Sequence, residues 1–216
     1  MNTVRFQDRE IPVGKILCLG RNYAQHAKEM SAPVPEMPVV FLKPSTALVK
    51  DGCSVRVPSI SKELHHEVEM VVMIGKIARG IDVSTAMEHI AGYGVGLDMT
   101  LRDIQAAAKK EGLPWTVAKG FDTSAPVSTI IDRKSVRDPH NLRLTLKVNG
   151  ETRQSSNTMN MIFRIENVVS YLSFLFTLEP GDLIYTGTPE GVGPAASGDL
   201  LEAELESVGT LRVRIA

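Results

Sequence analysis

Short apolar segments with the composition of buried strands punctuate the first half of this chain. Residues 15–20 (KILCLG), 39–42 (VVFL) and 70–74 (MVVMI) contain few or no polar positions. Apolar runs of about four to eight residues, bounded by glycine, proline or charged residues, are typical of strands that are buried on both faces. We therefore predict a buried strand at each of these three places.

The strongest helical signal covers residues 100–111. Thr100 and Asp103 have the spacing of a capping box, with aspartate in place of the usual glutamate, so they predict where the helix begins. Gly112 is suited to the left-handed residue that follows a helix. Two further helices are predicted over residues 23–30 and 163–176.

The last third of the chain alternates apolar and polar residues, which is the pattern of half-buried strands. Residues 142–148 and 211–215 follow it, and Asn149-Gly150 is a strong signal for a hairpin turn after the first of them. Strands outnumber helices, and the order is not a regular strand–helix alternation. We therefore predict one domain over residues 1–216, of the α+β class and dominated by β-structure.

Composition narrows the class of protein. The chain has 216 residues, of which 43% are hydrophobic and 23% charged, as in an ordinary globular protein. The net charge is −1 and basic residues are scattered, which argues against a nucleic-acid-binding surface. Cys18 and Cys53 match neither a disulfide framework nor a zinc site. The N-terminus has no apolar signal-peptide core, and the longest apolar tract, 168–178, is too short to span a bilayer, so we expect a cytoplasmic protein.

Three acidic residues are candidates for a metal site. Glu67 and Glu69 precede the apolar run 70–74 and, on a strand, would point the same way. Like charges at the edge of a core are unfavourable unless a cation neutralises them. Asp98 ends a glycine-rich apolar stretch and adds a third oxygen ligand, a set that suits Mg²⁺ or Mn²⁺. The alternative is that the two glutamates line a solvated sheet face. His65 is expected to support the site rather than to bind the ion.

His26 and Glu29 are three residues apart on the predicted helix 23–30, so their side chains are neighbours. A carboxylate beside an imidazole fixes its tautomer and raises its basicity, which suits a general base. The alternative is an exposed helix pair without a catalytic role. Three prolines in residues 31–38 predict an irregular loop, and together residues 23–38 have the features of a mobile lid.

Two more segments carry candidate chemistry. Lys119 follows the only tryptophan, Trp115, and could meet an anionic substrate or a developing enolate instead of being a surface charge. The glycine- and proline-rich loop 186–194 could hold a carboxylate with its backbone amides, or be a tight connection. The chain has no dinucleotide-binding fingerprint, no serine-hydrolase elbow and no P-loop.

Six short blocks, in the same order along the chain, resemble the fumarylacetoacetate hydrolase superfamily, and especially its short members of the acylpyruvate hydrolase and oxaloacetate decarboxylase type. The blocks are residues 20–23 with His26 and Glu29, then 41–44, 65–69, 97–103, 118–122 and 185–193. The resemblance implies a mixed β-roll with a few helices, and a homodimer. It also implies Mg²⁺ or Mn²⁺ on Glu67, Glu69 and Asp98, a lid that carries His26 and Glu29, and Lys119 in the pocket. Substrate contacts are implied for Arg21, Arg102, Gln105 and Thr188.

From this set we expect cleavage of a C–C bond in short 2-oxo or 2,4-dioxo acids. His26, supported by Glu29, would activate water, and pyruvate would leave as an enolate held by the metal and Lys119. The same site could support oxaloacetate decarboxylation or tautomerisation. Two alternatives are an isomerase, decarboxylase or hydratase of hydroxymuconate-type intermediates, and a non-catalytic metal-dependent protein that binds keto acids.

Overall fold

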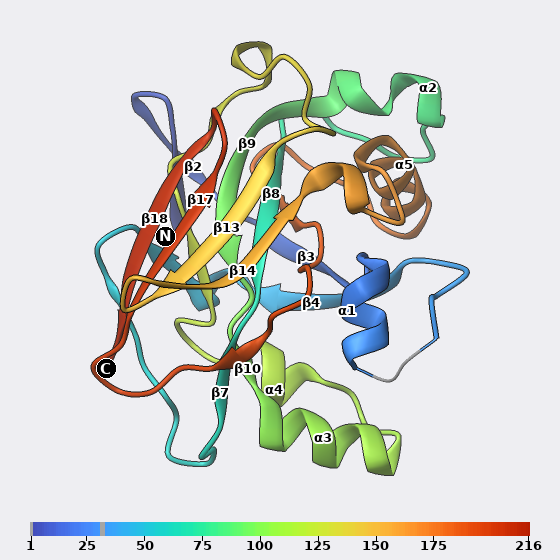
Figure 1. Cartoon of the computed structure of the whole chain (residues 1–216). Helices are drawn as coiled ribbons and strands as arrows, with labels where there is room; N and C mark the ends of the chain where they lie inside the picture. Colours follow the sequence, from blue (N-terminus) through green and yellow to red (C-terminus); the bar gives the residue numbers. More distant parts are fainter. Residues whose placement is uncertain (1, 31–32) are drawn as a thin grey trace.

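The structure is a computed structural model that describes residues 2–30 and 33–216, and two large β-sheets dominate it (Figure 1). The larger sheet has eight strands. Its central strands come from the short apolar segments of the chain, which can be buried on both faces of a sheet. In spatial order they are β4 (Val39–Pro44), β3 (Lys15–Gly20), β15 (Leu183–Tyr185), β8 (Val68–Ile74), β9 (Ile90–Leu97), β11 (Ala125–Val127) and β5 (Leu48–Lys50), with β12 (Ile131–Asp132) paired to β9.

The second sheet has five strands and packs against the first, since β13, β17 and β18 contact β8 and β9. In Figure 1 its yellow and orange strands cross in front of β8 and β9, and its red strands lie to the left of them. Its spatial order is β14 (Glu151–Asn157), β13 (Arg143–Val148), β17 (Leu200–Leu205), β18 (Gly209–Ile215) and β6 (Ser54–Val55). Two small sheets complete the β-structure: β10 (Thr100–Leu101) with β7 (Leu64–His66) and β16 (Gly193–Pro194), and β1 (Thr3–Phe6) with β2 (Arg9–Pro12).

Helices lie around this β-roll. In Figure 1, α3 and α4 are at its lower end, α1 is at its right side, and α2 and α5 lie together at the upper right. Their bounds are α1 (Ala24–Glu29), α2 (Val83–Ala86), α3 (Arg102–Glu111), α4 (Thr116–Lys119) and α5 (Ile165–Leu175). The mixed, β-dominated α+β class expected from the sequence is therefore confirmed.

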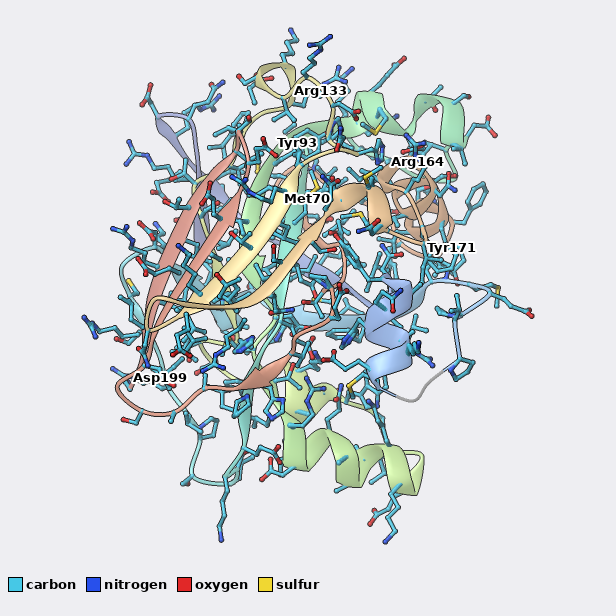
Figure 2. The ribbon with its side chains drawn as sticks, viewed as in Figure 1. Met70, Tyr93, Arg133, Arg164, Tyr171 and Asp199 are labelled. Carbon is cyan, nitrogen blue, oxygen red and sulfur yellow. The ribbon has the colours of Figure 1, made fainter. Side chains whose placement is uncertain are left out.

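Strand β8 is buried along its whole length and contributes to two cores. Val68, Met70 and Val72 face the large core between the two sheets. Tyr93 of β9 belongs to the same core as Met70 (Figure 2). Val71 and Met73 face a smaller core on the other side of the sheet. Because side chains alternate along a strand, Glu69 shares the face of Val71 and Met73. The strand therefore brings a carboxylate to the edge of the smaller core.

Most predicted elements lie within one or two residues of their observed bounds, with one correction at the start of α3. The prediction that Thr100 and Asp103 form a capping box is wrong. Thr100 belongs to β10, and the helix begins at Arg102 with no side-chain cap. The Asp103 carboxylate instead accepts hydrogen bonds from Ser61 Oγ (2.6 Å) and Lys62 N (3.0 Å). Tertiary pairing with β7 has replaced the local cap.

The hairpin predicted at Asn149-Gly150 is confirmed. It joins β13 to β14, and both turn residues have positive φ (52° and 83°), as a tight turn of this kind requires. At the predicted helix end, Gly112 also has the expected left-handed backbone, with φ of 68°.

Candidate active site

The three predicted acidic ligands meet at one end of β8 and β9. Glu69 lies on β8, Asp98 follows β9 directly, and Glu67 lies in the link between β7 and β8 rather than on β8 itself. The backbone N–H of Asp98 donates to the carbonyl of Glu67 (2.8 Å), which ties the two segments together. One carboxylate oxygen from each residue lies within 4.8 Å of the others, and all three side chains are buried. Glu67 and Glu69 therefore do not line a solvated face.

A glycine opposite Glu69 allows this arrangement. Gly96 of β9 pairs with Glu69, and a Cβ there would lie 2.6 Å from both Tyr185 Cε1 and Val71 Cγ2. The Tyr185 ring occupies the space that a side chain at position 96 would take, and its hydroxyl donates to the carbonyl of Pro126 (3.0 Å). The glycine thus admits an aromatic ring beside the acidic cluster.

Lys119 lies against the acidic cluster. Its Nζ donates to Glu67 Oε2 (2.7 Å), Asp98 Oδ2 (2.6 Å) and Thr100 Oγ1 (2.6 Å). The side chain is 2% exposed, yet it also lines the cavity in front of the carboxylates. In the structure the Lys119 ammonium therefore donates its hydrogen bonds to oxygens of the protein. The sequence had suggested an anionic substrate as its partner.

A second buried lysine, Lys43 of β4, has the same neighbourhood and was given no role by sequence reasoning. Its Nζ lies 2.8 Å from Asp98 Oδ1 and donates to the carbonyls of Met99 (3.1 Å), Ser124 (3.0 Å) and Lys119. An ammonium that is 1% exposed must find such partners. The signal that could have found it is a lysine at the end of a buried apolar strand.

The charges around the cluster shift the pKa values of Glu67 and Glu69 in opposite directions. Burial acts to raise the pKa of Glu67, but the Lys119 ammonium and the Arg102 guanidinium outweigh it and hold that pKa well below its usual range. Burial also acts to lower the pKa of Lys119, and the charges of Asp98 and Glu67 reverse that effect and raise it. For Glu69, burial and then the charges of Asp98 and Glu67 raise the pKa well above its usual range.

Glu69 is therefore the carboxylate whose charge is not compensated. Its Oε2 accepts a hydrogen bond from the backbone N–H of Gly187 (2.7 Å), whereas its Oε1 is buried with no partner. Three hard oxygen donors, one of them unpartnered, fit a divalent cation such as Mg²⁺ or Mn²⁺. The residues present thus suit the metal that the sequence suggested.

Arg102 and Gln105 extend the site along α3. Arg102 Nη2 donates to Glu67 Oε1 (2.5 Å), and its Nη1 donates to Gln105 Oε1 (2.6 Å). His65 contacts the guanidinium through Nδ1 (3.4 Å) and pairs with Glu63 through Nε2 (2.9 Å). His65 is thus a neighbour of Arg102 and not part of the acidic cluster.

The histidine–glutamate pair is formed as the spacing predicted. His26 Nδ1 lies 3.1 Å from Glu29 Oε2, and Glu29 Oε1 accepts from the backbone N–H of Gly191 (3.1 Å). His26 is 6% exposed and lines the cavity, whereas Glu29 is exposed, so the pair joins the cavity wall to the surface and is not a wholly exposed helix pair. With Nδ1–H donated to Glu29, Nε2 is the nitrogen left to accept a proton. Of the predicted lid 23–38, residues 31–32 lie outside the described residues, and its mobility stays a prediction.

The loop after β15 is fixed from several sides. Gly187 has φ of 94°, which favours glycine, and its Cβ position would be 2.6 Å from Asn22 Cβ. Thr188 Oγ1 donates to the carbonyl of Val68 (2.8 Å) and accepts from Gln154 Nε2 (2.8 Å). The amide at position 187 therefore holds a carboxylate of the protein, where the sequence suggested that this loop could hold a carboxylate or make a tight connection.

Gln154 was not identified from the sequence. It comes from β14 of the five-stranded sheet, and its Oε1 accepts from the backbone N–H of Val68 (3.0 Å) and contacts His66 Nδ1 (3.1 Å). Its amide thus joins the strand that carries Glu69 to the loop that carries Thr188. A single buried glutamine in a strand whose residues are all polar leaves no signal of this role in the sequence.

Arg21 follows β3 in an unfavourable backbone conformation. Its φ is 58°, and its Nε is buried with no hydrogen-bond partner. The next residue, Asn22, holds this turn in place, because its side chain donates to the carbonyl of Thr186 (2.8 Å) and accepts from the N–H of Phe163 (2.7 Å). Non-glycine residues in this region of φ cost free energy and are found at functional sites.

These groups surround a cavity of about 280 Å³. Glu67 and Lys119 form part of its wall, with Glu69 and Asp98 behind them. The predicted catalytic and substrate residues that line it are His26, Lys119, Arg21, Arg102, Gln105 and Thr188. The remaining wall is apolar or carries residues that were not predicted, namely Leu19, Gly20, Met30, Phe41, Lys109 and Trp115.

The chain is similar to known proteins over nearly its whole length. Residues 15–216 match the family model described as fumarylacetoacetate (FAA) hydrolase C-terminal. The mitochondrial oxaloacetate tautomerase FAHD1 of Mus musculus is 51% identical over 200 residues, covering 93% of this chain and 90% of that protein. The Homo sapiens FAHD1 is 47% identical with the same coverage.

Solved structures give the same result. The fumarylpyruvate hydrolase of Pseudomonas aeruginosa, in complex with Mn²⁺ and pyruvate, superposes with a TM-score of 0.95 at 40% identity, covering 100% of this chain and 97% of that one. The 5-carboxymethyl-2-hydroxymuconate delta-isomerase of Mycobacterium smegmatis superposes with a TM-score of 0.85 at 39% identity, covering 94% and 79%. This chain is therefore a member of the fumarylacetoacetate hydrolase family.

Proposed function

We propose that this protein is a divalent-metal-dependent enzyme that interconverts the keto and enol forms of oxaloacetate. One observation carries the proposal: the buried cluster of Glu67, Glu69 and Asp98 adjoins the same cavity as the imidazole of His26. A proton-accepting group and a site for a Lewis acid are the two parts that enolisation of a 2-oxo acid requires. The tautomerases at 47–51% identity support this reaction ahead of the others.

Glu67, Glu69 and Asp98 would hold Mg²⁺ or Mn²⁺. When bound, the cation supplies Lewis-acid polarisation of the 2-oxo group, which makes the hydrogens on C3 more acidic. The Mn²⁺ and pyruvate in the Pseudomonas aeruginosa hydrolase support both the metal and the kind of ligand.

His26 performs the proton transfer. Its Nε2 takes a proton from C3 while the 2-oxo oxygen is protonated by solvent, and the reverse steps regenerate the keto form. Glu29 keeps the proton of His26 on Nδ1 and stabilises the imidazolium, because its second oxygen is fixed by the N–H of Gly191. Arg102, with Gln105 beside it, binds the substrate carboxylate. Lys119 forms direct ion pairs with Glu67 and Asp98, and its charge helps to hold the pKa of Glu67 below its usual range.

Hydrolysis of acylpyruvates is the second candidate, and the hydrolase at a TM-score of 0.95 favours it. His26 would then take a proton from water as the water oxygen attacks the distal carbonyl. The C3–C4 bond breaks, and pyruvate and a carboxylic acid are released. Oxaloacetate decarboxylation forms the same pyruvate enol without water, and a hydroxymuconate-type isomerisation needs only the proton transfer.

Activity assays on metal-free and Mg²⁺- or Mn²⁺-loaded protein test the proposal. We expect the loaded protein to speed the ultraviolet absorbance change of oxaloacetate enol, and His26→Ala to lower the rate by about 10²- to 10⁴-fold. Pyruvate release from acetylpyruvate and from oxaloacetate measures hydrolysis and decarboxylation separately. The matched control is His140→Ala, which removes a histidine paired with Glu166 outside the cavity.

Each outcome distinguishes the candidates. Enol turnover without pyruvate release supports the tautomerase, and metal-dependent pyruvate release from acetylpyruvate supports the hydrolase. Tight binding of keto acids without turnover of any of them would instead support a non-catalytic binding protein. A rate that does not change when the metal is removed would contradict the proposal.

A further inference from the structure

The cavity contains more positive charge than its carboxylates balance. Four cationic side chains line it: Arg21, Arg102, Lys109 and Lys119. Arg102 and Lys119 form ion pairs with Glu67, and Lys119 pairs with Asp98 as well. Among residues 2–30 and 33–216, Arg21 and Lys109 have no carboxylate within ion-pair distance. Two charges are thus left facing the cavity.

Lys109 is placed there by the geometry of α3. It is seven residues after Arg102 and four after Gln105, so all three lie on one face of the helix. Its Nζ lies 5.2 Å from the centroid of the Trp115 ring, and that ring packs edge-on against Phe41 (5.9 Å) in the cavity wall. A cation–π contact therefore holds the ammonium at the exposed rim of the cavity.

The neighbouring charges repel this ammonium. Partial burial lowers the pKa of Lys109, and the guanidinium of Arg102 adds to the effect, followed by smaller contributions from Lys119 and Arg21 that Glu67 opposes. A bound anion would relieve this repulsion. The buried, unpartnered Nε of Arg21 is a second donor for the same anion.

We infer that Lys109 and Arg21 form a second anion subsite, which binds the distal carboxylate of a 2-oxo dicarboxylic acid. Arg102 and the acidic cluster receive the 2-oxo end of the substrate, and Lys109, about two turns further along the same face of α3, receives the other end. The site therefore prefers dianionic 2-oxo acids to monoanionic ones. The inference rests on the proposed function, because it takes this cavity as the place where the 2-oxo acid binds.

Two ligands of equal carbon number test it: 2-oxoglutarate, which has a distal carboxylate, and 2-oxopentanoate, which lacks one. Calorimetric titration of the Mg²⁺-loaded protein measures binding of each without relying on turnover. We expect Lys109→Met to weaken 2-oxoglutarate about 5- to 20-fold and to change 2-oxopentanoate by less than about 2-fold. Lys109→Arg should keep the preference, since it keeps the charge.

Lys110→Met is the matched control, because Lys110 is the next residue on α3 but does not line the cavity. It should leave both affinities unchanged. Methionine is a good helix former, so neither substitution disturbs α3. Equal affinity of the wild type for the two ligands, or equal weakening of both in Lys109→Met, would overturn the subsite.

The assays of enzymatic activity separate this inference from the proposed function. Suppose that the wild type turns over no 2-oxo acid but binds 2-oxoglutarate preferentially, and that Lys109→Met abolishes this preference. That result would support the subsite and contradict the proposed function. An active wild type whose preference survives Lys109→Met keeps the function and rejects the subsite.

Discussion

Charge compensation decides the properties of individual residues in this site. Lys43 and Lys119 place two buried ammonium groups on Asp98, one on each oxygen. Both lysines would be expensive to bury alone, and so would the carboxylates. Each therefore stabilises the other, and this network keeps the site folded before any ion binds.

Removing Lys43 should expose that dependence. We expect Lys43→Met to lower the free energy of unfolding by about 3 kcal/mol, because it leaves Asp98 with one fewer cation and removes a buried donor shared by three backbone carbonyls. Urea unfolding of the metal-free protein measures the change. Lys50→Met is the control, since the Lys50–Glu10 pair is exposed, and it should have little effect. An equal loss in both variants would contradict the assigned role of Lys43.

At the level of elements, close packing between β9 and its neighbours positions the acidic cluster. Asp98 is aimed at Glu67 and Glu69 because β9 ends there, and β9 can approach β8 and Tyr185 closely because it carries glycine opposite Glu69. Helix α3 then presents Arg102 and Gln105 to the same cavity. The function of these elements is to hold side chains that local sequence alone would leave apart.

Gly96→Ala tests this packing. The new methyl group would lie 2.6 Å from Tyr185 and Val71, so we expect a loss of about 1–3 kcal/mol in the free energy of unfolding. Thermal or urea unfolding measures it. At Gly193 of β16 the nearest atom to an added Cβ is His66 Nε2 at 3.6 Å, an ordinary contact, so Gly193→Ala should cost less. The opposite order would contradict the close-packing explanation.

At the scale of the whole molecule, the roll collects site residues from distant parts of the chain. His26 lies on α1, Glu69 on β8 of the large sheet, and Thr188 after β15, while Gln154 of the second sheet holds two of these segments together. In the described part of the chain, no helix is long and apolar enough to cross a membrane. The homodimer and the cytoplasmic location stay predictions, and the two FAHD1 relatives are described as mitochondrial.

Metal binding should stabilise the whole fold. A ligand that binds only the native state at 100 times its Kd adds about 2.7 kcal/mol to the free energy of unfolding, so Mg²⁺ or Mn²⁺ should raise the melting temperature and EDTA should reverse the rise. Glu69→Gln, which removes the uncompensated carboxylate, should abolish this stabilisation while the metal-free protein remains folded. A metal-induced rise of the same size in Glu69→Gln would exclude Glu69 as a ligand.

The sequence determined the elements and much of the site chemistry. Apolar runs located β3, β4 and β8, Asn149-Gly150 located the hairpin, and the spacing of His26 and Glu29 predicted their contact, because these features depend on neighbours along the chain. The acidic candidates were also found this way, since charges beside apolar runs need compensation.

Only the tertiary structure decided which charges compensate one another. Gln154 gave no local signal, the position of Lys43 after an apolar run did not show which carboxylate it pairs with, and the capping box at Thr100 was lost because β10 pairs with β7 instead. The partners of Lys119 were also decided by the fold, because its ammonium forms ion pairs with Glu67 and Asp98. Ion pairs and strand pairing join residues far apart in sequence, and their free energy depends on burial that exists only after the chain has folded.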